Sequence, residues 1–205
     1  MNDKVVCWVK QYVNMMMGSL ENHYYHQYEH ALEVAQRSLE IWQQEWLDDK
    51  SLEILYIAGL FHDIGFVIQY DDNEYIGATL AKNYLQSILY PMDKIKIIEE
   101  LIIATIYTRT PQNILESIIR DADTDNLGRD DFFDKWERLK QEIESIKTIK
   151  ILDPEWTHYS IKFLLWHHFI TKTEIKDRQP KKDENLKVLE RKMEYFHKKL
   201  PPKKI

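Results

Sequence analysis

One segment of the chain is apolar on every side of the helix that it would form, and it constrains the fold more than any other. Residues 51–65 have the sequence SLEILYIAGLFHDIG, in which the stretch from Leu55 to Phe61 is almost purely hydrophobic. A helix at a protein surface keeps a polar stripe, whereas a helix that is apolar all round is buried. We therefore expect a central helix that other helices cover, with His62 and Asp63 at its end.

The remaining pattern also predicts helices. The chain has only 5 Gly and 6 Pro among 205 residues, and a sheet-rich fold would need more of these turn-forming residues. Apolar residues recur at helical spacing, and no segment alternates apolar and polar residues for long enough to make a sheet. Asn73 is a candidate helix cap, and Asp48 and Asp49 are turn or cap residues. The expected helices cover about 5–17, 25–46, 51–65, 73–88, 91–106, 113–119, 132–146, 155–171 and 183–199.

Composition narrows the class of protein. Hydrophobic residues make up 44% and charged residues 30%, as in ordinary globular domains. A net charge of −6 argues against a nucleic-acid coat protein, whose affinity comes from Lys and Arg. The single Cys7 forms no internal disulfide, and we see neither a signal peptide nor a membrane-spanning run. We expect a cytoplasmic protein without a membrane partner; an oligomer is compatible with the sequence.

Three clusters of polar residues are candidates for a functional site, and each also has a purely structural explanation. An ionised Asp63 at the end of a buried helix is costly unless it is paired or bound to a metal, yet a His62–Asp63 hydrogen bond could simply cap that helix. His26 and His30 are four residues apart and would share one helix face, but they also fit a polar helix start.

The third cluster is acidic. Asp121, Asp123 and Asp125 follow the apolar stretch 114–119, and neighbouring carboxylates repel one another unless a cation or hydrogen bonds compensate. An acidic loop or a helix cap is the alternative explanation. Together with histidine, carboxylates make a nitrogen and oxygen donor set that suits Mn, Fe, Zn, Ni or Mg.

The order of these clusters resembles the HD superfamily of metal-dependent phosphohydrolases. Its motifs are matched by YHQYEHALEV at 25–34, AGLFHDIG at 58–65 and IRDADTDNLGR at 119–129. Two further stretches, LIIAT at 101–105 and LKQE at 139–142, are similar to a subgroup of small predicted HD hydrolases. The resemblance implies an all-α, HD-domain-like helical bundle with a metal site between central helices. We expect a single domain over 1–205, with a motif core at about 25–142 and a C-terminal helical extension at about 155–200.

The resemblance also implies roles for individual residues. The metal ligands would be His30, His62, Asp63 and Asp123. Asp63 would also act as the catalytic proton acceptor, and His26 would donate a proton to the leaving oxygen. Residues expected to orient a ligand or to contact the substrate are Asp121, Glu74 and Arg129.

One departure from the family pattern concerns the metal content. Many HD proteins have His-Glu after the HD pair, where this chain has Asn73-Glu74. Asparagine is a poor ligand for transition metals, so we expect one tightly bound divalent ion (Mn, Fe, Ni, Co, Zn or Mg). The same change disfavours the HD oxygenases, whose di-iron centre needs additional histidines.

The implied activity is hydrolysis of a phosphomonoester or phosphodiester in a small phosphorylated substrate, of which a nucleotide is the best candidate. Two alternatives remain open. The chain is a sensor that binds a metal and a nucleotide with little turnover, or it is a helical interaction protein whose polar clusters are caps. The stretch Trp166-His167-His168 is interpreted as packing.

Overall fold

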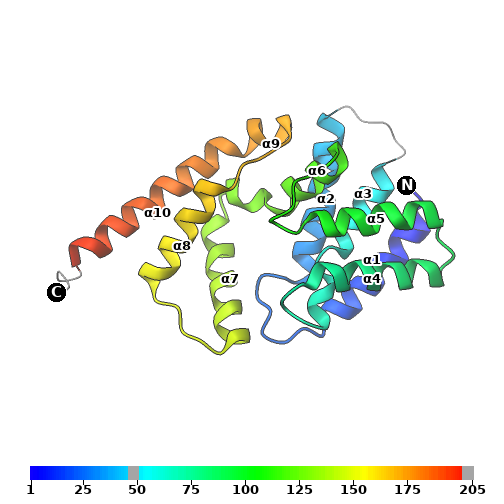
Figure 1. Ribbon diagram of the computed structural model, residues 1–205, viewed down its shortest axis with the longest axis horizontal. Helices are drawn as coiled ribbons and strands as arrows, with labels where there is room; N and C mark the ends of the chain where they lie inside the picture. Colours follow the sequence, from blue (N-terminus) through cyan, green and yellow to red (C-terminus); the bar gives the residue numbers. More distant parts are fainter. Residues whose placement is uncertain (46–50, 200–205) are drawn as a thin grey trace.

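The computed structural model describes residues 1–45 and 51–199, and all regular structure within them is helical (Figure 1). This confirms the all-α prediction, while the expected turn at Asp48 and Asp49 lies outside the described residues. The helices are α1 (Asp3–Met17), α2 (Tyr28–Gln44), α3 (Leu52–Phe61), α4 (Asn73–Ser87), α5 (Met92–Ala104), α6 (Ile114–Asp123), α7 (Phe132–Lys147), α8 (Asp153–Trp166), α9 (Lys172–Asp177) and α10 (Gln179–Lys199), with 3₁₀ turns η1 (Ile64–Val67) and η2 (Asp125–Gly128).

The central helix is α3. Every residue from Glu53 to Phe61 is buried, as its uniform hydrophobicity predicts. The helix ends at Phe61, earlier than expected, and the chain continues as the 3₁₀ turn η1. His62 and Asp63 therefore occupy the junction between α3 and η1, and both are buried.

Gly59 sets the distance between α2 and α3. A Cβ atom at this position would lie 2.6 Å from the Cα of Ala35 and 2.8 Å from its backbone nitrogen, closer than real Cβ atoms approach. The two helices can therefore pack this tightly only where α3 carries glycine. This close approach brings the end of α3 beside the first turn of α2.

A second close approach packs η1 against the start of α4. A Cβ atom on Gly65 would lie 1.8 Å from the carbonyl oxygen of Asn73, so glycine is required there as well. Asn73 is the first residue of α4 and Asp72 precedes it, so the prediction that Asn73 caps this helix was wrong by one position.

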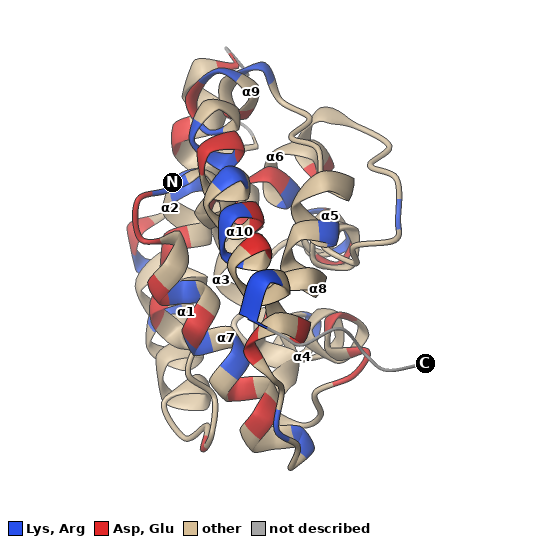
Figure 2. Ribbon diagram, turned by 90° about the vertical axis from the view of Figure 1, so that its left-hand side faces the viewer, with Lys and Arg blue, Asp and Glu red and all other residues tan. Residues whose placement is uncertain are grey.

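The apolar side chains form two clusters. The larger one gathers residues of α1 to α6, and the smaller one gathers residues of η2, α7, α8 and α10. In Figure 1, α7, α8 and α10 lie at the end of the molecule opposite α1 and α4. Lys, Arg, Asp and Glu alternate along α10 (Figure 2). Among the described residues, no helix has the length and apolar character needed to cross a membrane.

The C-terminal third departs from the expected helix boundaries. The predicted helix 155–171 ends at Trp166, and the final helix begins at Gln179 instead of near 183. The packing expected for the histidine run holds for His167, which is 5% exposed, but Trp166 is 58% exposed. The non-helical stretch 167–171 is the part of the chain that reaches α6.

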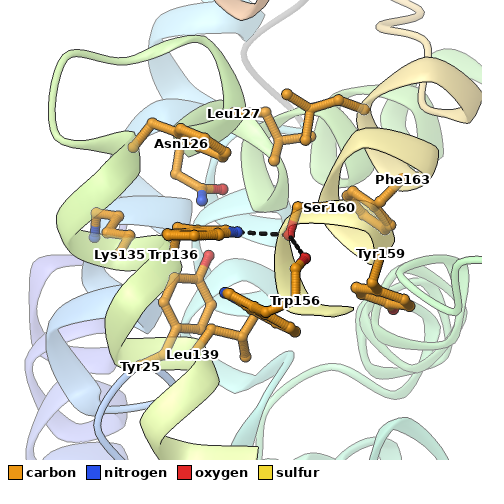
Figure 3. Close-up of a pocket in the computed structure, with 12 residues that line it drawn as sticks. Tyr25, Asn126, Leu127, Lys135, Trp136, Leu139, Trp156, Tyr159, Ser160 and Phe163 are labelled. Carbon is orange, nitrogen blue, oxygen red and sulfur yellow. Dashed lines mark hydrogen bonds between the residues drawn. The ribbon is translucent and has the colours of Figure 1, made fainter. Parts of the chain in front are cut away.

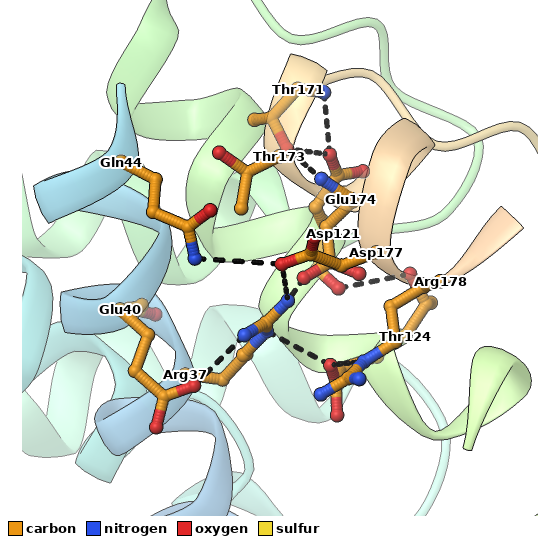
Figure 4. Close-up of polar contacts among 12 residues, drawn as sticks. Arg37, Glu40, Gln44, Asp121, Thr124, Thr171, Thr173, Glu174, Asp177 and Arg178 are labelled. Carbon is orange, nitrogen blue, oxygen red and sulfur yellow. Dashed lines mark hydrogen bonds and ion pairs between the residues drawn. The ribbon is translucent and has the colours of Figure 1, made fainter. Parts of the chain in front are cut away.

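A buried arginine joins the two clusters (Figure 4). The Nε of Arg37 in α2 lies 2.7 Å from a Glu174 oxygen and 2.9 Å from an Asp125 oxygen. The other guanidinium nitrogens reach Glu40 at 2.8 Å and Asp177 at 3.4 Å. The arginine side chain is 9% exposed, so solvent screens these ion pairs weakly. Arg37 thus ties α2 to η2 and α9.

The carboxylates around Arg37 outnumber the cations. Arg37 contacts four carboxyl groups, and the two further cations, Arg178 and Arg129, both pair with Asp125. Burial and the proximity of Asp125 raise the pKa of Glu174 to about 8, although Arg37 opposes this shift. A proton on Glu174 at neutral pH therefore reduces the negative charge of this cluster. Arg37, which contacts all four carboxyl groups, offsets much of the charge that remains.

Arg37→Ala should destabilise the protein strongly, because it removes the guanidinium group that pairs with the buried Glu174 and Asp125. Removal of one partner from a buried ion pair costs about 3–5 kcal/mol. Urea unfolding followed by circular dichroism measures the loss. Arg138→Ala, at an exposed position of α7, is the control and should leave the free energy of unfolding nearly unchanged. Equal stability of the two variants would contradict the role assigned to Arg37.

Candidate metal centre

Three helices bring the predicted ligands together. His30 lies in the first turn of α2, His62 and Asp63 follow the last residue of α3, and Asp123 is the last residue of α6. The sequence placed Asp123 after its helix, whereas the structure places it in the final turn. The helix begins at Ile114, where the side chain of Asn113 accepts a hydrogen bond from the Glu116 amide at 3.0 Å.

The four side chains converge on one small volume. His30 Nε2 lies 3.2 Å from Asp123 Oδ1 and 3.6 Å from Asp63 Oδ2. His62 Nε2 lies 3.2 Å from the same Asp123 oxygen and 3.0 Å from the same Asp63 oxygen. The ligand atoms of His30, His62 and Asp123 all lie within 4.8 Å of one another. These are the distances at which several donors share one cation.

Two details of the hydrogen bonding fit a divalent ion. His62 Nδ1 lies 2.8 Å from the carbonyl oxygen of Gly59, which places a proton on Nδ1 and makes Nε2 the ring atom that can bind a metal. Both His62 Nε2 and Asp63 Oδ2 are buried without a hydrogen-bond partner among the described residues. Their 3.0 Å separation lacks hydrogen-bond geometry, so each atom remains available as a ligand.

Charge at the centre is concentrated and buried. Burial disfavours the charged form of Asp123, but His62 and His30 outweigh it and lower the pKa of this carboxyl group. The pKa of Asp63 is likewise lowered by His62 and His26 against the effect of burial. Burial lowers the pKa of His30. Burial opposes protonation of His62, but Asp63 and Asp123 outweigh it and raise the pKa of this imidazole well above its ordinary value. The centre therefore holds two ionised carboxylates that stabilise positive charge between them, which favours a cation.

His26 lies beside the centre, but not as the sequence predicts. Helix α2 begins at Tyr28, so His26 precedes it and does not share a helix face with His30. The two rings are nevertheless 6.0 Å apart between centroids, and His26 also contacts Phe66 at 4.3 Å. A different interaction must therefore hold His26 in place.

That interaction comes from Glu142 in α7. Its carboxylate hydrogen-bonds to His26 Nδ1 and accepts hydrogen bonds from the backbone amides of Tyr24 at 2.9 Å, Tyr25 at 2.8 Å and His26 at 3.0 Å. Tyr70 donates to the same group at 3.2 Å. Glu142 is fully buried, and although burial opposes ionisation, these hydrogen bonds lower its pKa to about 2.

The sequence pattern predicted no role for Glu142, although this residue lies in the LKQE stretch that is similar to a subgroup of HD hydrolases. The structural consequence for His26 is electrostatic. Burial opposes protonation of His26, but Asp63 and Glu142 outweigh it and raise the pKa of the imidazole. The Nδ1 atom is occupied by Glu142, so any proton that His26 exchanges with a ligand is on Nε2.

The three residues expected to orient a ligand or to contact the substrate have separate surroundings. Asp121 accepts hydrogen bonds from the amides of Ile170 at 3.0 Å and Thr171 at 2.6 Å, and not from a ligand histidine. Burial raises its pKa to about 6. Asp121 therefore fastens stretch 167–171 to α6, and so supports the helix that carries Asp123.

Glu74 and Arg129 differ in how available their side chains are to a metal or a substrate. Burial, followed by the proximity of Asp63 and Asp123, raises the pKa of Glu74, so this carboxyl group lies within electrostatic reach of the centre. Arg129 is paired with Asp131 at 2.6 Å and with Glu33 at 3.0 Å. Arg129 also lies 3.5 Å from an Asp125 oxygen, and an arginine paired with three acids is less available to a substrate than the sequence suggested.

Comparisons with known proteins agree with this geometry. Residues 27–125 match the family model of the HD domain. The structure is similar to that of the Lin1889 protein from Listeria innocua, with a TM-score of 0.63, 21% identity, and coverage of 95% of this chain and 98% of that one. It is also similar to a predicted HD superfamily hydrolase from an uncultured Thermotogales bacterium, with a TM-score of 0.59, 17% identity, and coverage of 94% and 92%.

No curated protein matches the chain. The family match spans α2 to α6, the helices that carry all four converging side chains, and the structural likeness extends over nearly the whole molecule. The part of the chain that carries these four side chains, residues 27–125, therefore matches the HD domain.

Proposed function

We propose that the protein is a metal-dependent phosphohydrolase that cleaves a phosphomonoester or phosphodiester bond in a small phosphorylated substrate such as a nucleotide. One observation carries the proposal: two imidazole nitrogens and two carboxylates converge in a buried site beside a histidine held by Glu142. The ligands would be His30, His62, Asp63 and Asp123. Hydrolysis fits the family and the description of the Thermotogales relative as a hydrolase.

The residues divide the chemistry between them. A divalent cation, when bound, supplies a Lewis acid that polarises a phosphoryl oxygen and makes water more acidic. Asp63 accepts a proton from the attacking water as the new P–O bond forms. His26 gives the proton on Nε2 to the leaving oxygen as the old P–O bond breaks. Glu142 keeps that imidazole oriented and protonated. General acid–base help of this kind contributes roughly 10²–10⁴-fold to a rate.

The substrate would be anionic and small. A phosphate near the four ligands is neutralised locally by the cation, so the overall charge of −6 does not oppose binding. The cationic side chains of Lys82 and Arg120 are less available to bind the phosphate of a substrate. Lys82 pairs with Glu99 at 3.1 Å, and Arg120 donates to the Tyr107 carbonyl at 2.9 Å. The part of the substrate that carries no phosphate must then be recognised by other residues around the site.

The first prediction concerns the metal. Protein purified without an affinity tag and incubated with Mn, Ni, Co or Zn should bind about one equivalent, as a single site with this donor set requires. His30→Ala should weaken the affinity by more than the roughly 10- to 100-fold that loss of an outer partner costs. Elemental analysis and calorimetry provide the measurements. His158→Ala, at an exposed position of α8, is the control. Undiminished binding in His30→Ala would refute the ligand assignment.

The second prediction tests hydrolysis. Asp63→Ala should abolish release of phosphate or nucleoside from a panel of nucleoside mono-, di-, tri- and cyclic phosphates, because it removes a ligand and the proton acceptor together. Circular dichroism should remain that of a folded helical protein. Asp130→Ala, a change at a surface carboxylate, should retain full activity. Wild-type protein that binds metal but hydrolyses nothing on the panel would favour the sensor alternative.

The third prediction is a shift of the pH profile. Glu142 raises the pKa of His26, so the protonated acid persists to higher pH. Glu142→Gln removes that charge and should move the alkaline limb of the kcat profile to lower pH, besides lowering kcat. Glu137→Gln, an exposed change on the same helix, is the matched control. A reduced kcat with an unmoved limb would mean that Glu142 acts only as a structural support.

A further inference from the structure

A cavity between α7 and α8 lies beside the metal centre (Figure 3). Its volume is about 90 Å³, and its walls are mainly aromatic and aliphatic, with Asn126, Lys135 and Ser160 as the polar members. No acidic residue lines it. The aromatic lining residues are Tyr25, Phe132, Trp136, Trp156, Tyr159 and Phe163.

One wall is shared with the metal centre. The ring of Tyr25 lines the cavity and lies 4.7 Å from the ring of the proposed ligand His30 and 4.8 Å from that of His26. Glu142 holds this wall in place through the Tyr25 amide. One aromatic ring therefore separates the cavity from the site where a phosphoryl group would be cleaved, and a substrate that occupies both lies alongside Tyr25.

An unused hydrogen-bond donor marks the cavity as more than a packing gap. Trp136 donates its indole N–H to Ser160 at 2.5 Å, whereas the indole nitrogen of Trp156 has no hydrogen-bond partner among the described residues. Trp156 is only 3% exposed. In Figure 3 its nitrogen is on the side of the ring that faces Tyr25 and Trp136. A buried N–H without an acceptor is costly, so an acceptor supplied by a ligand would be favoured.

Size and charge restrict what can enter. The cavity, at about 90 Å³, is smaller than the engineered apolar cavity of roughly 150 Å³ that holds one benzene molecule. A single six-membered ring therefore enters only as the wall side chains shift, and the two fused rings of a purine need a much larger shift. The aromatic walls favour a flat ring, which they can contact by stacking or edge to face. The absence of acidic side chains from the lining avoids repulsion of an anionic substrate.

We propose that this cavity is the specificity pocket of the enzyme, and that it takes a monocyclic aromatic ring with a hydrogen-bond acceptor, such as the pyrimidine base of a nucleotide. The carbonyl oxygen of such a ring would accept the hydrogen bond from the Trp156 indole. The proposal rests on the proposed function, since it assigns the non-phosphate part of the same substrate. It predicts a preference for pyrimidine over purine compounds.

Uridine without phosphate tests the pocket separately from catalysis. The chain has six tryptophans, and in ¹⁵N-labelled protein each gives an indole N–H signal; the signal of Trp156 is the one missing from Trp156→Phe. Addition of uridine to metal-free protein should shift this signal. The signal of Trp166, which is in the same helix but 58% exposed, should stay unchanged. Adenosine should bind at least about tenfold more weakly, because its two fused rings need a larger displacement of the cavity walls than the single ring of uridine.

Two variants complete the test. Trp156→Phe keeps an aromatic ring but removes the donor, and it should weaken uridine binding roughly three- to tenfold, the effect of one neutral hydrogen bond. Leu139→Phe fills the cavity from α7 and should abolish binding, whereas the same change at the exposed Leu165 should not. Thermal unfolding checks that each variant is folded. If Leu139→Phe is unfolded, the uridine affinity of Trp156→Phe tests the proposal alone.

The outcomes separate the two proposals. An unshifted Trp156 signal, equal binding of uridine and adenosine, or unchanged uridine affinity in Trp156→Phe would overturn the specificity pocket, even if the protein hydrolyses phosphate esters. Uridine binding with the expected pattern supports the pocket even if no hydrolysis is found, and in that case only the proposed activity fails.

Discussion

The tight packing of α2 against α3 at Gly59 is the constraint on which the centre depends. Without a Cβ at Gly59 the backbone of α3 reaches Ala35 of α2, and the end of one helix meets the start of the other. The same residue supplies the carbonyl oxygen that holds the proton on His62 Nδ1. A single glycine therefore sets both the separation of the histidines and the ring nitrogen of His62 that can bind a metal.

The C-terminal helices complete the site from outside the HD motifs. Glu142 of α7 holds the segment that carries His26, Asp121 anchors stretch 167–171 against α6, and Arg37 joins α2 to α9. Each contact uses a charged group buried between the two apolar clusters. Because an unpaired charge there is costly, these contacts fix how the second cluster sits on the first, and with it the position of the aromatic cavity.

The metal centre and the cluster around Arg37 both bury several carboxyl groups, but their negative charge is offset in different ways. Around Arg37, the excess of carboxylate is relieved by a proton on Glu174, whose pKa is raised to about 8. At the centre, the pKa values of Asp63 and Asp123 are lowered, so both carboxylates stay ionised. The ionised carboxylates of Asp63 and Asp123 keep oxygen atoms available as ligands, which favours a metal ion at the centre. Glu174, whose carboxyl group is protonated beside Arg37, contributes to structure instead.

The sequence by itself determined the all-α class, the burial of α3 and the grouping of His62 with Asp63, because helical periodicity and uniform hydrophobicity are local properties. The order of its motifs also indicated that His30 and Asp123 belong to the same centre. Only the tertiary structure decided that Glu142 orients His26, that His26 precedes α2, and that Trp156 faces a cavity. Glu142 and His26 are 116 residues apart, and contacts across such a separation depend on how the helices pack, which local pattern does not encode.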